Sequence, residues 1–215
     1  MIKRSCSKAL KKRPIMPLGA IKSKSKCQYG PTNTYILSSP IGNFEVICCQ
    51  NGIHSMGQIK EITDETFRVE KGKEVKIVSQ LYKDNGYIYT PLIKLCQWLQ
   101  IYFTGGSEVK SLPLPSICFA SFKEGTFTGK VWKTLAEKVG FGETVSYGKL
   151  ANLCGSPHGS RAAGQAMRNN PIQIIVPCHR VILSSGQIGN YTGGRRNKVK
   201  AWLLEHEGSF PPEVK

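Results

Sequence analysis

One cysteine in this sequence stands where it could act as a nucleophile. Cys178 lies between Pro177 and His179 and follows an apolar run over residues 172–176, which we expect to be buried and to hold it rigidly. A free thiol has a pKa of ~8.5 and is a poor nucleophile at neutral pH unless a neighbouring base or positive charge activates it. His179 and Arg180 are candidate neighbours, although successive side chains often point apart. A structural buried cysteine beside a satisfied histidine is the alternative.

Helices are predicted on both sides of this cysteine. Thr128 can cap a helix that ends at Gly140, and Ser146 can cap a short helix over 147–154. After a Gly-Ser-Pro turn at 155–157, a second helix is expected over 158–168, with a last one over 197–207. Two short helices joined by such a turn fit a helix-turn-helix.

The N-terminal part is predicted to be an antiparallel sheet with one helix. Short apolar runs at 35–37 and 44–47 and a third strand from Ile53 are separated by turn signals, of which Asn51-Gly52 indicates a tight hairpin. A fourth strand is expected near 75–78. Thr90-Pro91 predicts a helix start, with Thr90 as the N-cap, and apolar residues then repeat at helical spacing up to Gly105.

The charge of +16 is distributed unevenly. Residues 1–26 hold nine Lys or Arg and no acid, residues 27–122 are neutral, and residues 123–215 carry a net +7. This pattern favours contact of two parts of the chain with a polyanion such as nucleic acid, although an excess of lysine can also serve solubility alone. No apolar run is long enough to span a membrane, and the basic N-terminus lacks the apolar core of a secretory signal.

Residues 1–26 are rich in Lys and Ser, lack periodicity and predict a disordered tail. Lys11-Lys12-Arg13-Pro14 could be a nuclear address or a DNA-binding arm, or a solvated run without a role. The chain has eight cysteines. Without a signal peptide or a compact cysteine framework, they indicate intracellular thiols, metal ligands or a nucleophile more than disulfides.

The stretch Ile175-Val176-Pro177-Cys178-His179-Arg180-Val181-Ile182 resembles the active-site signature of the O6-alkylguanine-DNA alkyltransferases, also called methylated-DNA–protein-cysteine methyltransferases. The resemblance runs from Phe127 to Gly208 through several further blocks in order, among them Ser146-Tyr147, Arg161-Ala162, Asn170-Pro171, the run 189–194 (Gly-Asn-Tyr-Thr-Gly-Gly) and His206-Glu207-Gly208. Residues 39–59 and 92–103 are similar to the family's N-terminal domain more weakly. The tail is not covered.

The resemblance implies single-turnover repair of double-stranded DNA. An alkyl group would pass from O6 of guanine, or O4 of thymine, to Cys178 and remain there as a thioether. His179 would take the thiol proton through a water and Glu207 would orient that imidazole, as in a nucleophile–base–carboxylate triad. Asn170 would support the active-site turn, and Tyr147 would help to protonate the leaving base.

The resemblance also implies how the damaged base arrives. A base inside a duplex cannot reach a buried thiol, so it must be flipped out. Arg161 would fill the vacated stack, and the small Ala162 would let its helix approach the minor groove. The resemblance further implies one set of residues that contacts DNA and one that lines the substrate pocket. The DNA-binding set adds Gln165 and Arg168 to Tyr147, Arg161 and Ala162, and the substrate pocket comprises Tyr147, Met167, Val181, Tyr191 and Thr192.

A few positions depart from the family's pattern. Gln165 and Gln173 stand where many relatives carry smaller or more rigid residues, and Arg195-Arg196 falls in a connection about two residues longer than usual. These departures leave the pocket width and the range of accepted alkyl groups open.

A structural zinc site is a further expectation. Cys49 ends one strand and His54 lies just after the start of the next, across the Asn51-Gly52 turn, so both could reach one ion. Some relatives hold zinc with two Cys and two His here. Cys49 and His54 match two of those positions, Cys27 matches a third if a short insertion is allowed, and Cys118 falls on the fourth. The alternative is four unrelated residues packed as small hydrophobes.

The sequence therefore predicts an α+β fold, with an antiparallel-sheet (ribonuclease H-like) domain over 27–118 and a mostly helical domain with a helix-turn-helix over 119–215. We expect a nuclear monomer that binds no organic cofactor. Two rival functions are a cysteine hydrolase that uses Cys178, His179 and Glu207, and a DNA-binding protein without chemistry.

Overall fold

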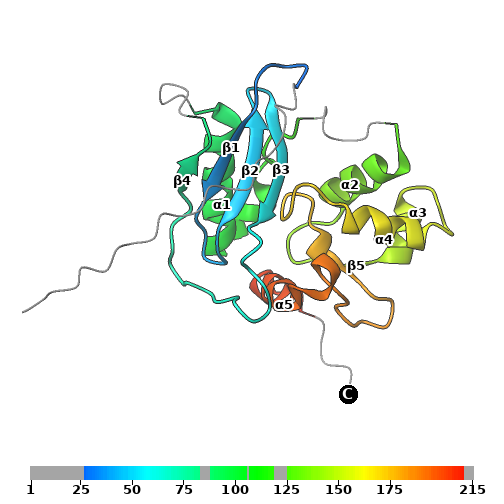
Figure 1. Cartoon of the computed structure of the whole chain (residues 1–215). Coiled ribbons are helices and arrows are strands. Elements are labelled where there is room, and N and C mark those ends of the chain that lie inside the picture. Colours follow the sequence, from blue (N-terminus) through cyan, green and yellow to red (C-terminus); the bar gives the residue numbers. More distant parts are fainter. Residues whose placement is uncertain (1–26, 83–87, 106, 119–124, 211–215) are drawn as a thin grey trace, which may run out of the picture.

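The computed structural model describes residues 27–82, 88–105, 107–118 and 125–210 (Figure 1). The tail expected at 1–26 lies outside the described residues. We call residues 27–118 the N-terminal half and residues 125–210 the C-terminal half.

The N-terminal half is built on a four-stranded antiparallel sheet with the order β3-β2-β1-β4. Its strands are β1 (Asn33–Leu37), β2 (Phe44–Cys49), β3 (Gly52–Gln58) and β4 (Ile77–Gln80). Alternate residues of β1 and β2 are buried, as expected for strands that cover a core with one face. The three strands expected from the hairpin signals are confirmed, but the turn between β2 and β3 is Gln50-Asn51, one residue earlier than expected, because Gly52 already pairs with Cys49. The fourth strand begins two residues later than the predicted start at 75.

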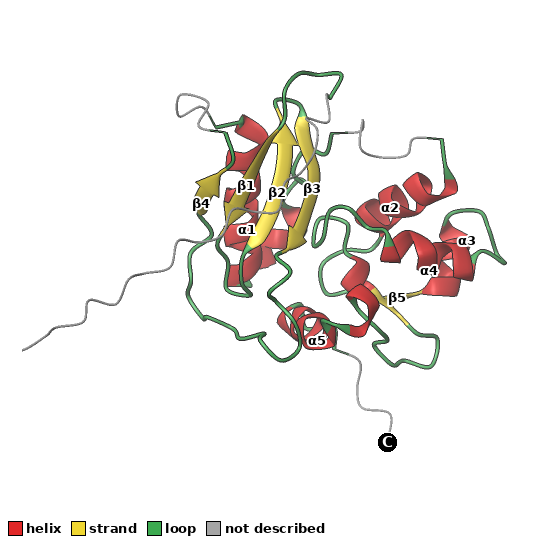
Figure 2. Cartoon of the chain, viewed as in Figure 1, coloured by secondary structure: helices red, strands yellow, loops and turns green. Residues whose placement is uncertain are grey.

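Helix α1 (Thr90–Thr104) covers the sheet (Figure 2), and its apolar stripe of Leu92, Leu95, Leu99 and Tyr102 is fully buried. The prediction that Thr90 is the N-cap was wrong by one residue. Tyr89 has extended backbone angles, and its carbonyl accepts the amides of Leu92 and Ile93, so Thr90 is already helical. Pro91 has no amide hydrogen to lose near a helix start, which permits this earlier beginning.

The C-terminal half is mostly helical. Its elements are α2 (Phe127–Lys138), β5 (Val145–Ser146), α3 (Tyr147–Leu153), α4 (Ser160–Arg168), β6 (Val181–Ile182) and α5 (Asn197–His206), with β5 and β6 parallel. Ser146 caps α3 as expected, by accepting from the Lys149 amide at 3.2 Å. The expected cap at Thr128 was wrong. Thr126 accepts from the Gly129 amide instead, and the partly buried Phe127 joins the first turn.

The two halves share one apolar core and several polar contacts. The backbone of Met56 in β3 exchanges hydrogen bonds with Pro171 and Gln173, at 2.9 and 2.8 Å. The Gln173 side chain accepts the Gln58 amide at 3.1 Å, and the guanidinium of Arg196 donates to the carbonyls at 59 and 62. Two of the positions that departed from the family's pattern, Gln173 and Arg196, therefore join the halves.

No helix in the described ranges combines the length and apolar character that crossing a membrane would require.

Candidate active site

Cys178 begins a single 3-10 turn, Cys178–Arg180, which follows the apolar run 172–176. That run is buried, apart from the half-buried Gln173, as the sequence indicated. It folds as an irregular loop in which Ile174 has a φ of 69°, a left-handed conformation that is unfavourable for a β-branched residue. Such strain persists only where surrounding contacts fix the backbone, so the loop before Cys178 is held in a defined shape.

Asn170 supplies much of that fixation. Its side-chain oxygen accepts the Ile172 amide at 2.9 Å, and its Nδ2 donates to the Val176 carbonyl at 2.7 Å. The same Nδ2 donates to the Cys178 Sγ at 3.0 Å. One amide side chain thus closes the loop and fixes the position of the sulfur.

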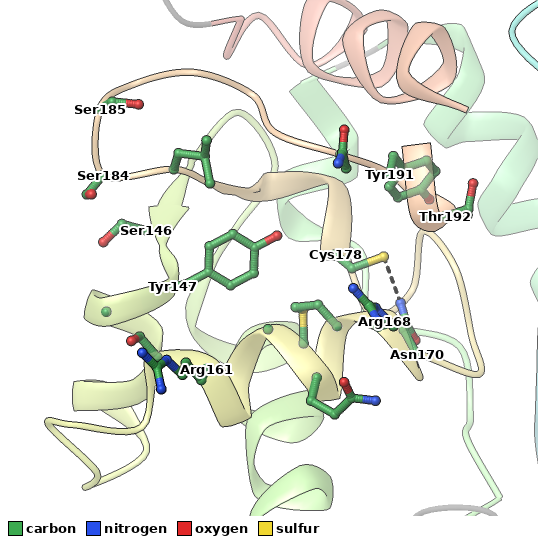
Figure 3. Close-up of a pocket in the computed structure, with 18 of the residues that line it drawn as sticks. Ser146, Tyr147, Arg161, Arg168, Asn170, Cys178, Ser184, Ser185, Tyr191 and Thr192 are labelled. Atoms are coloured by element: carbon green, nitrogen blue, oxygen red, sulfur yellow. Dashed lines mark hydrogen bonds between the residues drawn. The ribbon is translucent and has the colours of Figure 1, made fainter. Parts of the chain in front are cut away.

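Cys178 faces an open cavity of about 950 Å³ between α4 and the loops around β6 (Figure 3). The aromatic rings of Tyr147 and Tyr191 flank the sulfur, and the Tyr147 hydroxyl points toward it. Arg161 and Arg168 give the mouth of the cavity positive charge. The two tyrosine rings can pack against a planar group, and the two arginines at the mouth can bind an anionic chain that carries it.

The thiol of Cys178 is protonated at rest. Burial raises its pKa, and the opposing hydrogen bonds from Asn170 and Tyr191 and the charge of Lys200 do not cancel that effect. The thiol therefore needs a base to become a thiolate when it reacts.

His179, the residue after Cys178, has a ring that can accept a proton. Burial lowers the pKa of its imidazole despite the opposing effect of Glu207, so the ring is neutral at neutral pH and can accept a proton. Nε2 lies 2.8 Å from Glu207 Oε1. With a carboxylate as acceptor, Nε2 carries the hydrogen, which leaves the Nδ1 lone pair free. Nδ1 is buried and has no hydrogen-bond partner among the described residues.

The carboxylate of Glu207 is only 5% exposed and accepts several hydrogen bonds. Arg180 donates from Nε to Oε2 at 2.8 Å and from Nη2 to Oε1 at 3.0 Å. Burial would raise the pKa of this carboxyl, but the charges and hydrogen bonds of His179 and Arg180 outweigh burial and hold the pKa well below its usual range. Arg180, considered above as an activator of the thiol, thus forms its ion pair with Glu207.

The other expected site residues divide into two groups. Met167, Gln165 and Thr192 line the cavity together with the residues named above. Ala162 is exposed on α4 and Val181 is fully buried, and neither of them lines the cavity.

Two residues near the site were not identified as functional from the sequence. Lys200 is 1% exposed, and its Nζ donates to the Val181 carbonyl at 2.7 Å. Burial lowers the pKa of this lysine to about 8 against the opposing effect of Cys178. Lys200 lies on the same face of α5 as Leu203 and Leu204, and this position could have identified it from the sequence, since lysine on an apolar helix face is rare. Tyr102 contacts Glu207 but was interpreted only as a core position of α1.

A second cluster lies in the N-terminal half. The ligand atoms of Cys27, Cys49, His54 and Cys118 all lie within 4.8 Å of one another. Cys27 Sγ is 3.7 Å from Cys49 Sγ and 3.6 Å from Cys118 Sγ. Backbone amides of Tyr29 and Asn51 donate to two of these sulfurs. The sequence expectation that these four residues meet is confirmed.

Gly52 explains how Cys118 reaches this cluster. The segment 116–118 pairs with Ile53 through two backbone hydrogen bonds of 2.9 Å. A Cβ atom on Gly52 would lie 2.6 Å from the Cys118 amide nitrogen, closer than real contacts allow. A glycine is therefore required where the segment crosses the hairpin.

The fold and the site define an α/β protein with a buried cysteine next to a buried, neutral histidine at the floor of a basic cavity. Residues 126–209 match the family described as 6-O-methylguanine DNA methyltransferase, DNA binding domain. The chain is 40% identical over 173 residues to the methylated-DNA–protein-cysteine methyltransferase of Mus musculus. The aligned residues make up 80% of each of the two chains. The chain belongs to this family.

Solved structures agree with this assignment. The O6-methylguanine methyltransferase of Mycobacterium tuberculosis superposes with a TM-score of 0.59 at 29% identity, over 84% of this chain and 96% of that one. The same organism's protein in complex with DNA superposes with a TM-score of 0.57 at 30% identity, over 83% and 94% of the two chains.

Proposed function

We propose that this chain repairs DNA by transferring an alkyl group from O6 of guanine to Cys178, once per molecule. The observation that carries the proposal is the cysteine itself: its sulfur faces the cavity and accepts a hydrogen bond from Asn170. The adjacent His179 is buried and neutral, and its Nδ1 has no hydrogen-bond partner among the described residues. Mass spectrometry of the protein after incubation with methylated duplex DNA tests the proposal.

The residues suggest how the reaction runs. A water that bridges Cys178 and Nδ1 of His179 would carry the thiol proton to the imidazole, and Glu207 would stabilise the resulting imidazolium. The thiolate attacks the alkyl carbon, a C–S bond forms, and the C–O bond breaks with its electrons left on the guanine. Tyr147, whose pKa is raised by burial and by Cys178, stays protonated at neutral pH and can donate a hydrogen bond to the leaving guanine anion. That anion takes up a proton from water, and the imidazolium of His179 returns its proton to water. The thioether is stable, so the protein is consumed.

We further propose that α3 and α4 act as a helix-turn-helix that binds duplex DNA. Gly155 provides the turn between them with a φ of 73°, and α3 packs against α4. Arg161 and Ala162 are exposed at the start of α4, next to the cavity mouth, as a helix that inserts into a groove requires. Thr192 Oγ1 is buried at the cavity wall without a hydrogen-bond partner in the described ranges, and it can donate to the guanine oxygen.

The assignment of Arg161 predicts a defect that depends on the substrate. Arg161→Ala should slow transfer from duplex DNA by about tenfold or more but barely change transfer from free O6-alkylguanine, because only the duplex requires unstacking, which costs a few kcal/mol. The measurement is the second-order rate constant on each substrate.

The matched control is Arg68→Ala, which removes the same charge from an exposed site in the N-terminal half. It should slow both reactions little. Equal losses on the two substrates in Arg161→Ala would remove Arg161 from the flipping role.

Both rival functions fit the site less well. A cysteine hydrolase would share Cys178, His179 and Glu207, but multiple turnover on an ester or peptide would be its signature. A DNA-binding protein without chemistry gives no reason for the hydrogen bond that holds the sulfur of Cys178. The domain boundaries given above, the ribonuclease H-like fold of the sheet, the monomeric state and the nuclear location remain predictions; the last rests on basic residues outside the described ranges.

The N-terminal cluster has the donor set of a structural zinc site. A tetrahedral zinc with Zn–S bonds of about 2.3 Å places its sulfurs roughly 3.8 Å apart, close to the sulfur distances of 3.6 and 3.7 Å here. The amides that donate to Cys27 and Cys49 would stabilise thiolates. We propose that Cys27, Cys49, His54 and Cys118 hold zinc as three thiolates and one imidazole in the N-terminal half.

Zinc at this cluster should be lost on Cys49→Ser, because oxygen from serine is a poor ligand for a site built of thiolates. We expect about one zinc per chain in the protein purified without chelator, little or none in the variant, and a lower melting temperature. Elemental analysis and thermal denaturation measure both.

Cys48→Ala is the control, since Cys48 is the adjacent buried cysteine but packs in the main core. It should keep its zinc. Metal-free wild-type protein whose melting temperature does not respond to a chelator would rule the site out.

A further inference from the structure

A buried tyrosine of the N-terminal half contacts the carboxylate behind His179. Tyr102, near the end of α1, is fully buried, and its hydroxyl donates to Glu207 Oε1 at 2.7 Å. That same oxygen lies 2.8 Å from Nε2 of His179. Oε1 therefore accepts from the tyrosine hydroxyl and the imidazole, as well as from Nη2 of Arg180 at 3.0 Å.

We infer that Tyr102 is a positioning residue for alkyl transfer, whose hydroxyl fixes the Glu207 carboxylate and sets how strongly it attracts the proton of His179. The inference rests on the proposed function, and it gives the N-terminal half a part in the chemistry. Residues 126–209, which match the family's DNA-binding domain, do not include Tyr102.

The side chain of Tyr102 has little freedom to move. Its ring stacks on Trp98 with centroids 5.3 Å apart and meets Phe103 and Phe141 edge to face. Its backbone carbonyl accepts from His206 Nε2 at 2.7 Å. Tyr102 thus contacts the end of α5 at two successive residues, His206 and Glu207.

The N-terminal half also holds the other end of α5. The carboxylate of Asp64 accepts the amides of Asn197 and Lys198 at 3.1 and 2.8 Å, and the Asp64 amide donates to the Arg195 carbonyl at 2.9 Å. Carboxylates stabilise helix N-termini through such bonds. Because α5 is anchored at both ends, the Glu207 carboxylate cannot follow a small movement of the imidazole.

The charges around this carboxylate decide the direction of the effect. Arg180 from the 3-10 turn, His179 beside it, Tyr102 from α1 and the Gly142 amide face Glu207, while Lys200, on α5 itself, acts on His179. Burial and Glu207 raise the pKa of Tyr102 well above its usual value, so the hydroxyl always carries its proton. A donated hydrogen bond stabilises the carboxylate charge and makes it a weaker attractor of the His179 proton.

Tyr102→Phe tests the inference, because it keeps the stacked ring and removes the hydroxyl alone. Released from one donor, Glu207 should hold the imidazolium more strongly, so the pKa of His179 should rise by about one unit, the size of one hydrogen bond to a charged group. NMR titration of the His179 ring measures this without any transfer reaction. The acid limb of the rate–pH profile on methylated duplex DNA should move to higher pH, with transfer about tenfold slower below its midpoint.

Tyr35→Phe is the matched control, since Tyr35 is also fully buried in the N-terminal half and lies in β1. It should leave the His179 titration and the pH profile unchanged. If Tyr102→Phe folds poorly, 3-fluorotyrosine at position 102 replaces it. Its more acidic hydroxyl should move the pKa of His179 downward.

Each outcome bears on a separate claim. An unchanged His179 pKa in both position-102 variants overturns the inference, and so does a rate loss in Tyr102→Phe that is equal at every pH, since a merely structural role predicts that pattern. Absence of alkyl transfer in the wild-type protein would instead refute the proposed function, and the NMR titration would still decide the role of Tyr102.

Discussion

Cys178→Ser should abolish alkyl transfer while leaving the fold intact. A serine hydroxyl is far less acidic than a thiol, and His179, whose pKa is lowered by burial, is too weak a base to remove its proton. Serine can keep the hydrogen bond from Asn170, so the loop before it need not move. After incubation with duplex DNA that carries O6-methylguanine, peptide mass spectrometry should find one added methyl on Cys178 in the wild-type protein and none in the variant.

Cys154→Ser is the control for this prediction, because Cys154 is also buried in the C-terminal half but lies outside the cavity lining. It should transfer the methyl group at close to the wild-type rate. A methyl group found on another cysteine, or repair by Cys178→Ser at a similar rate, would contradict the assignment of the acceptor.

The sequence was informative where local rules dominate. The Asn51-Gly52 signal predicted the hairpin between β2 and β3, although the turn itself is Gln50-Asn51 and Gly52 already pairs with Cys49. The spacing of Leu92, Leu95 and Leu99 predicted the buried face of α1. Cap positions were less reliable: Thr90 and Thr128 were each expected as caps, yet the caps fall at Tyr89 and Thr126. Helix ends are uncertain by one or two residues, and of these two helices only α2 is capped by a side chain, that of Thr126.

The candidate site residues could be predicted from the sequence for a different reason. Cys178 and His179 are adjacent, but only the resemblance linked them to Glu207, which lies 28 positions further on. Contacts between distant segments carry no local signal. The Tyr102–Glu207 hydrogen bond spans 105 positions, and the Arg196 contacts with the N-terminal half span more than 130. An apolar periodicity that marks Tyr102 as core cannot show where its hydroxyl points.

Glu207→Gln should lower both the transfer rate and the stability of the fold. The amide cannot stabilise the imidazolium of His179, so transfer should fall by about 10²- to 10⁴-fold, the range attributed to general acid–base groups. The change also leaves the buried Arg180 without its counter-charge. Removing one partner of a buried ion pair typically costs about 3–5 kcal/mol of the free energy of unfolding. Stopped-flow transfer assays and denaturant titrations at pH 7.5 measure the two effects.

Glu205→Gln is the matched control, since Glu205 lies on the same helix but is exposed to solvent. It should change the rate and the stability little. The folded pKa of Glu207 is depressed below its ordinary value of 4.5, so its contribution to stability is complete above that pH and is lost as the pH falls toward the folded pKa. A comparison at pH 7.5 therefore captures the whole contribution. A Glu207→Gln variant with wild-type rate would show that His179 acts without its carboxylate, and one with unchanged stability would show that Arg180 finds compensation elsewhere.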